Sequence, residues 1–251
     1  MRLGIVCLFF LSMVISLPTY AKEAEQPVKV DWPFDGILGK YNQQSLQNGL
    51  QVYLNSCTYC HSLKLVAYRN LTEIGLSENF VKAIAAEATV NDGPDEFGEM
   101  FDRPAVLSDR FALPFPNDQA ARFANGGALP PDLSLIVKAR KGGANYLFSI
   151  LTGYIDSPLG VEVAEGMMYN PYFPGGQISM PSPLYEGMLM NDEGVPFTID
   201  QMAYDVTQFL VWASEPKMEM RKKMGISVIM FLIIMTGLFI AVKRRVWANL
   251  H

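Results

Sequence analysis

The five residues 57–61, Cys-Thr-Tyr-Cys-His, constrain this chain more than any other segment. Two cysteines with two residues between them lie about one helical turn apart, which matches the two vinyl groups of a haem. The histidine directly after them can offer a ring nitrogen to the iron. The motif therefore predicts one haem c, attached covalently through Cys57 and Cys60, with His61 as an axial ligand.

Two other chemistries use closely spaced cysteines, and both explain the motif less well. A structural zinc site needs four protein ligands, but the only other cysteine is Cys7 and the only other histidine is His251. A dithiol redox pair leaves His61 without a role. Such pairs also occur next to a βαβ pattern, and the sequence around this motif has no such pattern. We therefore interpret the motif as a haem attachment site.

The N-terminus has the pattern of a secretory signal peptide. Arg2 precedes an apolar run at 3–17, and a cleavage site of the small-residue type, Thr19-Tyr20-Ala21, follows. This order predicts that residues 1–21 are removed by a cut after Ala21. An uncleaved anchor is the alternative, but the run is short for a membrane span. Removal would leave Cys57 and Cys60 as the only thiols, both committed to thioethers in an oxidising compartment.

A second apolar segment, 225–242, lies near the C-terminus and carries no charge. Its 18 residues would cover about 27 Å as a helix, close to the thickness of a bilayer core. Three basic residues flank it on each side, so the flanking charge does not decide its orientation. The signal peptide does, because it exports everything before the anchor. We expect a periplasmic haem domain at 22–220 and an inner-membrane anchor with a short cytoplasmic tail at 221–251.

The charges are unevenly distributed. All 25 acidic residues lie between Ala21 and Arg221, together with 13 basic residues, which gives that part a net charge of −12. Such a domain repels nucleic acid and attracts basic proteins. The acidity could also serve only solubility.

Periodicity predicts a mainly α domain with long irregular loops. Apolar helical faces are expected to run into the motif, to precede residues 91–94 and to follow Thr198, which opens a capping box with Gln201. Shorter helices are expected from Pro130 to Gly142 and from a cap at Asn145 to Gly153. The segments 94–125 and 154–196 are expected to be irregular, as loops that cover a ligand often are. The residues expected on the buried faces of these helices, in chain order, are 46, 50 and 53 before the motif; 80, 81, 84, 85 and 88 before residues 91–94; 133, 136 and 137 after Pro130; and 202, 206, 209, 210 and 213 after Thr198.

The sixth position of the iron has several candidate ligands. His251 would lie across the membrane from His61, which leaves methionine, an open position or a rarer ligand. Met202 lies on an expected core face. Met180 lies in a proline-rich segment that can aim a side chain, but these arguments favour it only modestly. The candidates outside the signal and anchor are Met100, Met167, Met168, Met180, Met188, Met190 and Met202.

Several longer segments resemble the cytochrome c1 family over nearly the whole chain that follows the signal peptide. They are WPFDG at 32–36, CTYCHS at 57–62, AYRNL at 67–71, PFPN at 114–117, ARFANGGALPPDLS at 121–134, LTGY at 151–154, YNPYFPG at 169–175, the segment 175–183 and the stretch 205–216. The segment 89–110 is short and acidic and departs from the family pattern, so the resemblance implies no docking residue within it.

The resemblance implies Met180 as the second axial ligand and a contact between Arg122 and a haem propionate. From the residues alone, an internal ion pair of Arg122 is equally compatible. The resemblance also implies a non-enzymatic electron carrier of a quinol:cytochrome c oxidoreductase. This subunit would lie beside cytochrome b, accept electrons from a Rieske iron–sulfur protein and pass them to a soluble or membrane c-type cytochrome. The rival functions are a haem enzyme or sensor that binds a small ligand, and a membrane cytochrome that serves an oxidase.

Overall fold

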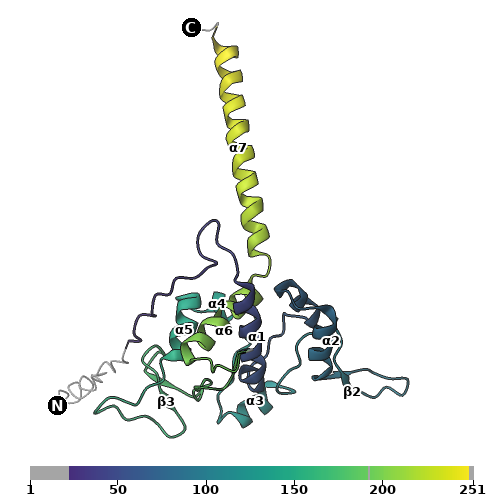
Figure 1. Cartoon of the computed structure of the whole chain (residues 1–251), viewed down its shortest axis with the longest axis vertical. Helices are drawn as coiled ribbons and strands as arrows, with labels where there is room; N and C mark the ends of the chain where they lie inside the picture. The colour runs from purple at the N-terminus through teal and green to yellow at the C-terminus, as the bar shows by residue number, and fades with distance from the viewer. Residues whose placement is uncertain (1–22, 192, 249–251) are drawn as a thin grey trace, which may run out of the picture.

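The computed structural model describes residues 23–191 and 193–248 and consists mostly of helices joined by long loops (Figure 1). The helices are α1 Gln43–Asn55, α2 Glu78–Ala86, α3 Asp118–Ala124, α4 Ile136–Ala139, α5 Gly143–Thr152, α6 Ile199–Ser214 and α7 Met218–Trp247, with 3-10 helices at Cys57–Tyr59 and Tyr68–Ile74. Two small antiparallel sheets pair β1 Thr89–Asp92 with β2 Phe101–Pro104, and β3 Met168–Tyr169 with β4 Gln177–Ile178. This architecture confirms the predicted fold class.

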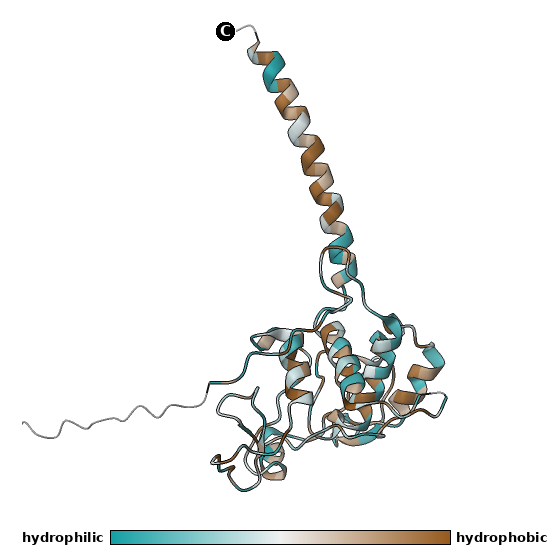
Figure 2. Cartoon of the chain, turned by 60° about the vertical axis from the view of Figure 1, so that its left-hand side comes forward, coloured by the Kyte–Doolittle hydropathy of each residue, from teal (hydrophilic) through white to brown (hydrophobic). Residues whose placement is uncertain are grey.

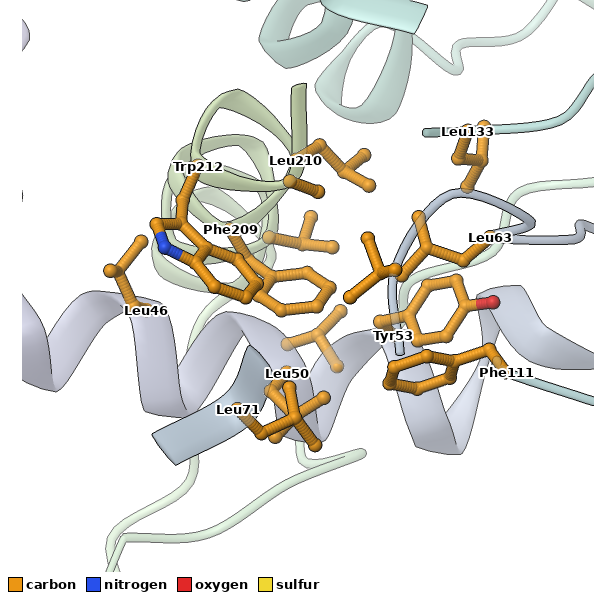
Figure 3. Close-up of a cluster of buried hydrophobic side chains, with 14 of the residues drawn as sticks. Leu46, Leu50, Tyr53, Leu63, Leu71, Phe111, Leu133, Phe209, Leu210 and Trp212 are labelled. Carbon is orange, nitrogen blue, oxygen red and sulfur yellow. The ribbon is translucent and has the colours of Figure 1, made fainter. Parts of the chain in front are cut away.

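The core lies between α1 and α6. Tyr53, the last residue of the apolar face of α1, is fully buried, with its ring centroid 5.9 Å from that of Phe209 and 5.7 Å from that of Phe111 (Figure 3). The predicted faces of both helices are buried as expected. Because α1 leads directly into the cysteine motif, burial of its apolar face places that motif against the core.

The two core helices approach closely at Gly49. A Cβ atom at this position would lie 2.2 Å from the backbone oxygen of Asp205 and 2.8 Å from Cβ of Phe209. Real side chains essentially never come this close, and a backbone oxygen cannot rotate away. Gly49 is therefore required by the α1–α6 contact.

We expect Gly49→Ala to lower the stability of the domain by about 2 kcal/mol. Overpacking typically costs about 1–3 kcal/mol, occasionally more, and a gain in helix propensity of up to about 1 kcal/mol offsets part of it. For about 200 residues this corresponds to a fall in Tm of about 4–8 °C, measurable by circular dichroism. Gln51→Ala, at an exposed position of the same helix, is the control and should change little. Equal Tm values for the two variants would contradict the close contact.

Helix α6 begins as predicted, with one difference. The Thr198 hydroxyl accepts a hydrogen bond from the Gln201 N–H (3.1 Å), but the Gln201 side chain donates to Asp205 (2.9 Å) and does not complete the capping box. The buried carboxylate of Asp205 competes for that amide. The helix ends at Ser214, before Glu215 and Pro216, as expected.

Two predicted helix starts are wrong. The chain from Pro130 to Leu135 is not helical, and only Ile136–Ala139 forms a short helix. The backbone before it is bonded to the motif instead, as described below. Helix α5 begins at Gly143, so Asn145 lies inside its first turn and is no cap. The side-chain Oδ1 of Asn145 accepts hydrogen bonds from the Trp32 indole (2.7 Å) and the Val30 N–H (3.2 Å), which hold the N-terminal segment on α5.

Part of the segment expected to be irregular forms the β1–β2 hairpin, which projects from the domain (Figure 1). Arg103 lies at its base and pairs with both Asp92 and Asp109. The strands are four residues each, too short to give a clear alternation in the sequence. Phe80, expected on the inner face of α2, is 53% exposed, whereas Val81 and Ala85 of the same face are buried.

Helix α7 contains the predicted span 225–242. Of the helices that the structure describes it alone is long and apolar enough to cross a membrane, with a mean hydropathy of 2.6 over its most apolar window and none of that window buried. Figure 2 shows this apolar section between two polar ends. The predicted signal peptide, with Cys7, and His251 lie outside the described residues.

Candidate functional site

The cysteine motif forms one tight turn at the end of α1. The Cys57 carbonyl accepts hydrogen bonds from the N–H groups of both Cys60 (3.2 Å) and His61 (2.8 Å). This closes a 3-10 turn at Cys57–Tyr59 and keeps both thiols on one turn of backbone. Both cysteines are free and partly exposed. Cys57 and Cys60 therefore lie on a single turn of backbone.

His61 has one ring nitrogen engaged by the protein. Its Nδ1 lies 2.8 Å from the carbonyl oxygen of Pro131, which requires the proton to be on Nδ1 and leaves the lone pair on Nε2 for a metal. Burial lowers the pKa of His61, while this hydrogen bond and the charge of Asp132 act in the opposite direction. The net shift is downward, so the imidazole is neutral at pH 7, as an iron ligand must be.

The segment 130–134 holds the Pro131 carbonyl in place. The Asp132 carboxylate accepts hydrogen bonds from the Ser62 hydroxyl (2.8 Å) and the Lys64 N–H (2.9 Å). The Leu133 N–H donates to the Ser62 carbonyl (2.9 Å). These bonds explain why the chain after Pro131 is not helical. They join two segments about 70 residues apart, and Asp132 acts as a positioning residue for His61.

We expect Asp132→Asn to destabilise the domain by about 1–2 kcal/mol at pH 7, because hydrogen bonds to a charged group are worth about 1.5–3 kcal/mol. Burial raises the pKa of Asp132, but hydrogen bonds from Lys64, Ser134 and Ser62 lower it more. A carboxylate with a lowered folded-state pKa stabilises the protein above its unfolded pKa of about 3.9. That stabilisation is lost as the pH falls through the folded-state value.

Thermal unfolding of both proteins at pH 7 and between about pH 4 and pH 2 checks this expectation. The difference in Tm should be largest at pH 7 and shrink in acid. Asp156→Asn, at an exposed loop position, is the control. A difference in Tm that does not depend on pH would contradict the role of the charge.

An open cavity of about 310 Å³ adjoins the motif. Cys60 and Ser62 line it together with both apolar and polar residues. The other lining residues are Lys64, Leu113, Pro114, Phe115, Pro116, Asn117, Asp118, Ala121, Leu129, Pro130, Pro131 and Asp132. Nearby on the chain, Tyr59 and Phe123 are 69% and 93% exposed. An apolar planar group bonded to Cys60 fits this chemistry, because it would cover apolar surface that the chain leaves open.

Met180 lies in a loop that is bonded to the motif. The loop follows β4, and the Met180 carbonyl accepts a hydrogen bond from the Tyr154 hydroxyl (3.1 Å). Three residues further on, the Pro183 carbonyl accepts one from the Ser56 hydroxyl (2.7 Å). Ser56 directly precedes Cys57, so this hydrogen bond holds Pro183 beside the start of the motif. Met180 is three residues from Pro183, which is at most about 11 Å of extended chain.

The other candidate methionines have different surroundings. Met202 is 1% exposed within the core, as the helix pattern predicted. The Met167 sulfur accepts a hydrogen bond from the Ser179 hydroxyl (3.2 Å), and Met188 packs against the core. The remaining three, Met100, Met168 and Met190, are 58%, 48% and 61% exposed.

Arg122, the candidate propionate ligand, lies on α3 next to Ala121, which lines the cavity. Its guanidinium donates to the Gly127 carbonyl (3.0 Å). Among the described residues it takes part in none of the ion pairs. The internal ion pair that the sequence left open is therefore not formed there, and the charge is available to an anion.

The dithiol alternative for the motif gains no support. Although Cys57 is partly exposed, desolvation of its thiol, and secondarily the proximity of Cys60, raises the pKa of that thiol to about 12, whereas reactive dithiols have lowered values. Within residues 23–191 and 193–248, no cluster of three or more potential metal ligands of the His, Cys, Asp or Glu type occurs.

Sequence reasoning missed several residues that build the site. Ser56 and Asp132 position the two candidate ligand segments, and the Tyr53 hydroxyl donates to the His61 carbonyl (3.1 Å). Ser56 adjoins the motif and Asp132 lies in the segment 121–134 that resembles the family, but their partners are 127 and 70 residues away. No local pattern identifies such pairs.

Known proteins match this chain over most of its length. Residues 32–250 match the Cytochrome C1 family. A protein of Solanum tuberosum named "Cytochrome c1-2, heme protein, mitochondrial" is 52% identical over 234 residues, covering 92% of this chain and 90% of its own. "Cytochrome c1" of Rhodospirillum rubrum is 44% identical over 256 residues, with 94% of each chain covered.

A third relative, named "Cytochrome b/c1", comes from Bradyrhizobium diazoefficiens. It is 44% identical over 250 residues, which cover 91% of this chain and 36% of the relative. The family match and these identities agree with the geometry of the motif and with the resemblance that the sequence carries. This chain therefore belongs to the cytochrome c1 family of membrane-anchored, haem-carrying electron-transfer subunits of the cytochrome bc1 complex.

Proposed function

We propose that this chain carries one haem c attached through Cys57 and Cys60, with His61 and Met180 as the axial ligands of its iron. One observation supports the proposal: the motif and the residue before it are hydrogen-bonded to two distant segments, one that orients His61 and one that follows Met180. His61 is bonded to Pro131, and the loop that follows Met180 is bonded to Ser56. Both contacts support a site in which His61 and Met180 serve the same haem.

The protein residues have distinct roles in this site. His61 offers the neutral Nε2, and Met180 offers a thioether sulfur, while Pro131 and Asp132 keep the imidazole oriented. Arg122 is free to pair with a propionate. A bound haem with histidine and methionine ligands supplies a one-electron couple of raised potential. With its sulfur on the iron, Met180 would exclude a small ligand from that position, which favours a carrier over an enzyme or sensor.

We further propose that this subunit accepts electrons from a Rieske iron–sulfur protein and passes them to a soluble or membrane c-type cytochrome, beside cytochrome b in the same complex. Membership of the cytochrome c1 family supports assembly of this chain into a cytochrome bc1 complex. The net charge of −12 before the anchor supports a basic acceptor and disfavours nucleic acid.

The proposed topology follows the sequence boundaries: a signal peptide at 1–21, a haem domain at 22–220 on the periplasmic side, and an anchor at 221–251 in the inner membrane. The apolar section of α7 supports the anchor. The first turns of α7 also pack on the domain, since Met218 is 5% exposed. A soluble fragment should therefore end after Lys223 to keep these contacts.

Purification of the full chain in mild detergent tests the proposal. We expect a low-spin haem spectrum with a methionine-to-iron band, and co-elution of cytochrome b and Rieske subunits. A high-spin haem that binds carbon monoxide in the reduced state would favour the ligand-binding alternative. Co-elution with oxidase subunits alone would favour the oxidase alternative.

The acidic surface gives a further expectation. If it binds a basic acceptor, the second-order rate of electron transfer should fall as salt rises from about 10 mM to about 200 mM, because the screening length shortens from about 30 Å to under 10 Å. Stopped-flow oxidation of the reduced protein measures this rate, with an acidic acceptor cytochrome as the control. A rate that does not depend on salt would mean that the acidity serves only solubility.

A further inference from the structure

A loop near the base of α7 carries two exposed apolar side chains. Ile37 and Leu38 are 74% and 79% exposed, side by side at the tip of the loop 34–39. The loop begins at Phe34, which is buried and stacks on Trp32 with ring centroids 5.4 Å apart. Since its base is fixed in an aromatic cluster, the exposure of the tip is a property of the folded domain and not of a loose end.

The same loop is bonded to the first turns of α7. The Lys222 ammonium donates to the carbonyl oxygens of Phe34 (2.6 Å) and Gly39 (3.2 Å), on both sides of the tip. The Tyr41 N–H donates to Glu219 (2.9 Å). A Cβ atom at Gly39 would lie 2.0 Å from the Asp35 carbonyl oxygen, so the neck of the loop is closely packed. These contacts fix the position of the tip relative to α7.

The tip therefore lies close to the expected membrane surface. Lys222 precedes the start of the uncharged segment 225–242 by three residues, or about 4.5 Å along a helix. Figures 1 and 2 both show a loop rising beside the base of α7. In Figure 1 its colour identifies it as the segment before α1. Ile37 and Leu38 are thus held at the level where the helix enters the bilayer.

We propose that the tip of the loop 34–39 inserts Ile37 and Leu38 into the interfacial layer of the membrane, as a second contact beside the anchor. Exposed apolar side chains at this level gain from transfer into the headgroup and acyl boundary. Asp35 and Lys40 cancel in charge, so the contact is apolar and needs no anionic lipid. Together with the bonds of Lys222 and Tyr41, it would set the tilt of the haem domain above the membrane. The contact does not depend on the haem.

Site-directed spin labelling of the full chain tests this proposal. Leu38→Cys is labelled with a nitroxide and reconstituted in phosphatidylcholine vesicles, and collisions with oxygen and with a water-soluble nickel chelate are compared. Leu159→Cys is the matched control. Leu159 is fully exposed and lies in the loop that leads into β3, and Figure 1 shows β3 on the part of the domain away from α7. The parent chain, without an added cysteine, shows whether Cys57 or Cys60 is labelled, which separates a failure of the haem assignment from a failure of this proposal.

We expect the ratio of oxygen to nickel accessibility to be several-fold higher at position 38 than at position 159, and Ile37→Cys to behave like Leu38→Cys. Equal ratios at 38 and 159 would overturn the proposal. The labelled protein is also measured within the intact complex. If the label at position 38 keeps its access to oxygen in the intact complex, the result supports a lipid contact in that complex. Loss of access to both reagents would mean that a partner subunit covers the tip, and would overturn the proposal in favour of a protein contact.

Discussion

Met180→Leu is expected to leave the haem covalently attached and to disable the protein as an electron carrier. Leucine has a similar volume but no sulfur lone pair, so the iron would lose a ligand while the packing of the loop changes little. The potential should fall, because axial ligands tune haem over about 0.8 V. Each 59 mV shifts a one-electron equilibrium about tenfold, so a drop of about 180 mV would disfavour reduction about a thousandfold.

Redox titration and the visible spectrum measure this effect directly. The methionine-to-iron band should disappear, and reduction by a Rieske donor, whose potential reaches about +300 mV, should become unfavourable. Met100→Leu is the matched control, because Met100 is 58% exposed and precedes strand β2 of the projecting hairpin. A normal spectrum and potential in Met180→Leu, with both lost in Met100→Leu, would assign the ligand to Met100.

The double replacement of Cys57 and Cys60 by alanine is expected to abolish covalent haem. Thioether bonds survive denaturing electrophoresis, whereas iron coordination alone does not, so the haem stain on this polypeptide should vanish completely. Each single variant should retain one bond at most. The loss cannot be repaired from elsewhere, because the only other cysteine is Cys7.

Tyr59→Ala is the control for the double variant. Tyr59 lies in the same turn, is 69% exposed and offers no sulfur, so its replacement should keep the stain. Comparison of haem stain with total protein in the same gel lane separates lost attachment from lost expression. A stain that persists in the double variant would contradict the attachment site.

The helices that form the core were predictable from the sequence, and the segments around the site were not. The apolar faces of α1 and α6 repeat at helical spacing, so local pattern and burial agree in them. Pro130 and Pro131 favour a helix start, yet Asp132 and Leu133 bond to residues 62 and 64, and the backbone follows those partners. Likewise, Asn145 looks like a helix cap but binds Trp32 from another segment.

What the sequence determined by itself is the chemistry: two thiols and an imidazole within five residues, an uncharged apolar segment of 18 residues, and the apolar stripes of the core helices. These signals are local, because covalent reach, membrane thickness and helical periodicity all act over a few turns of chain. Only the tertiary structure decided which carbonyl orients His61, which residue holds the loop that follows Met180, and that Lys222 fixes the exposed loop 34–39 at the base of α7. Each of these is a hydrogen bond between residues at least 70 positions apart, whose partners are chosen by the packing of the whole domain and leave no periodic trace in the sequence.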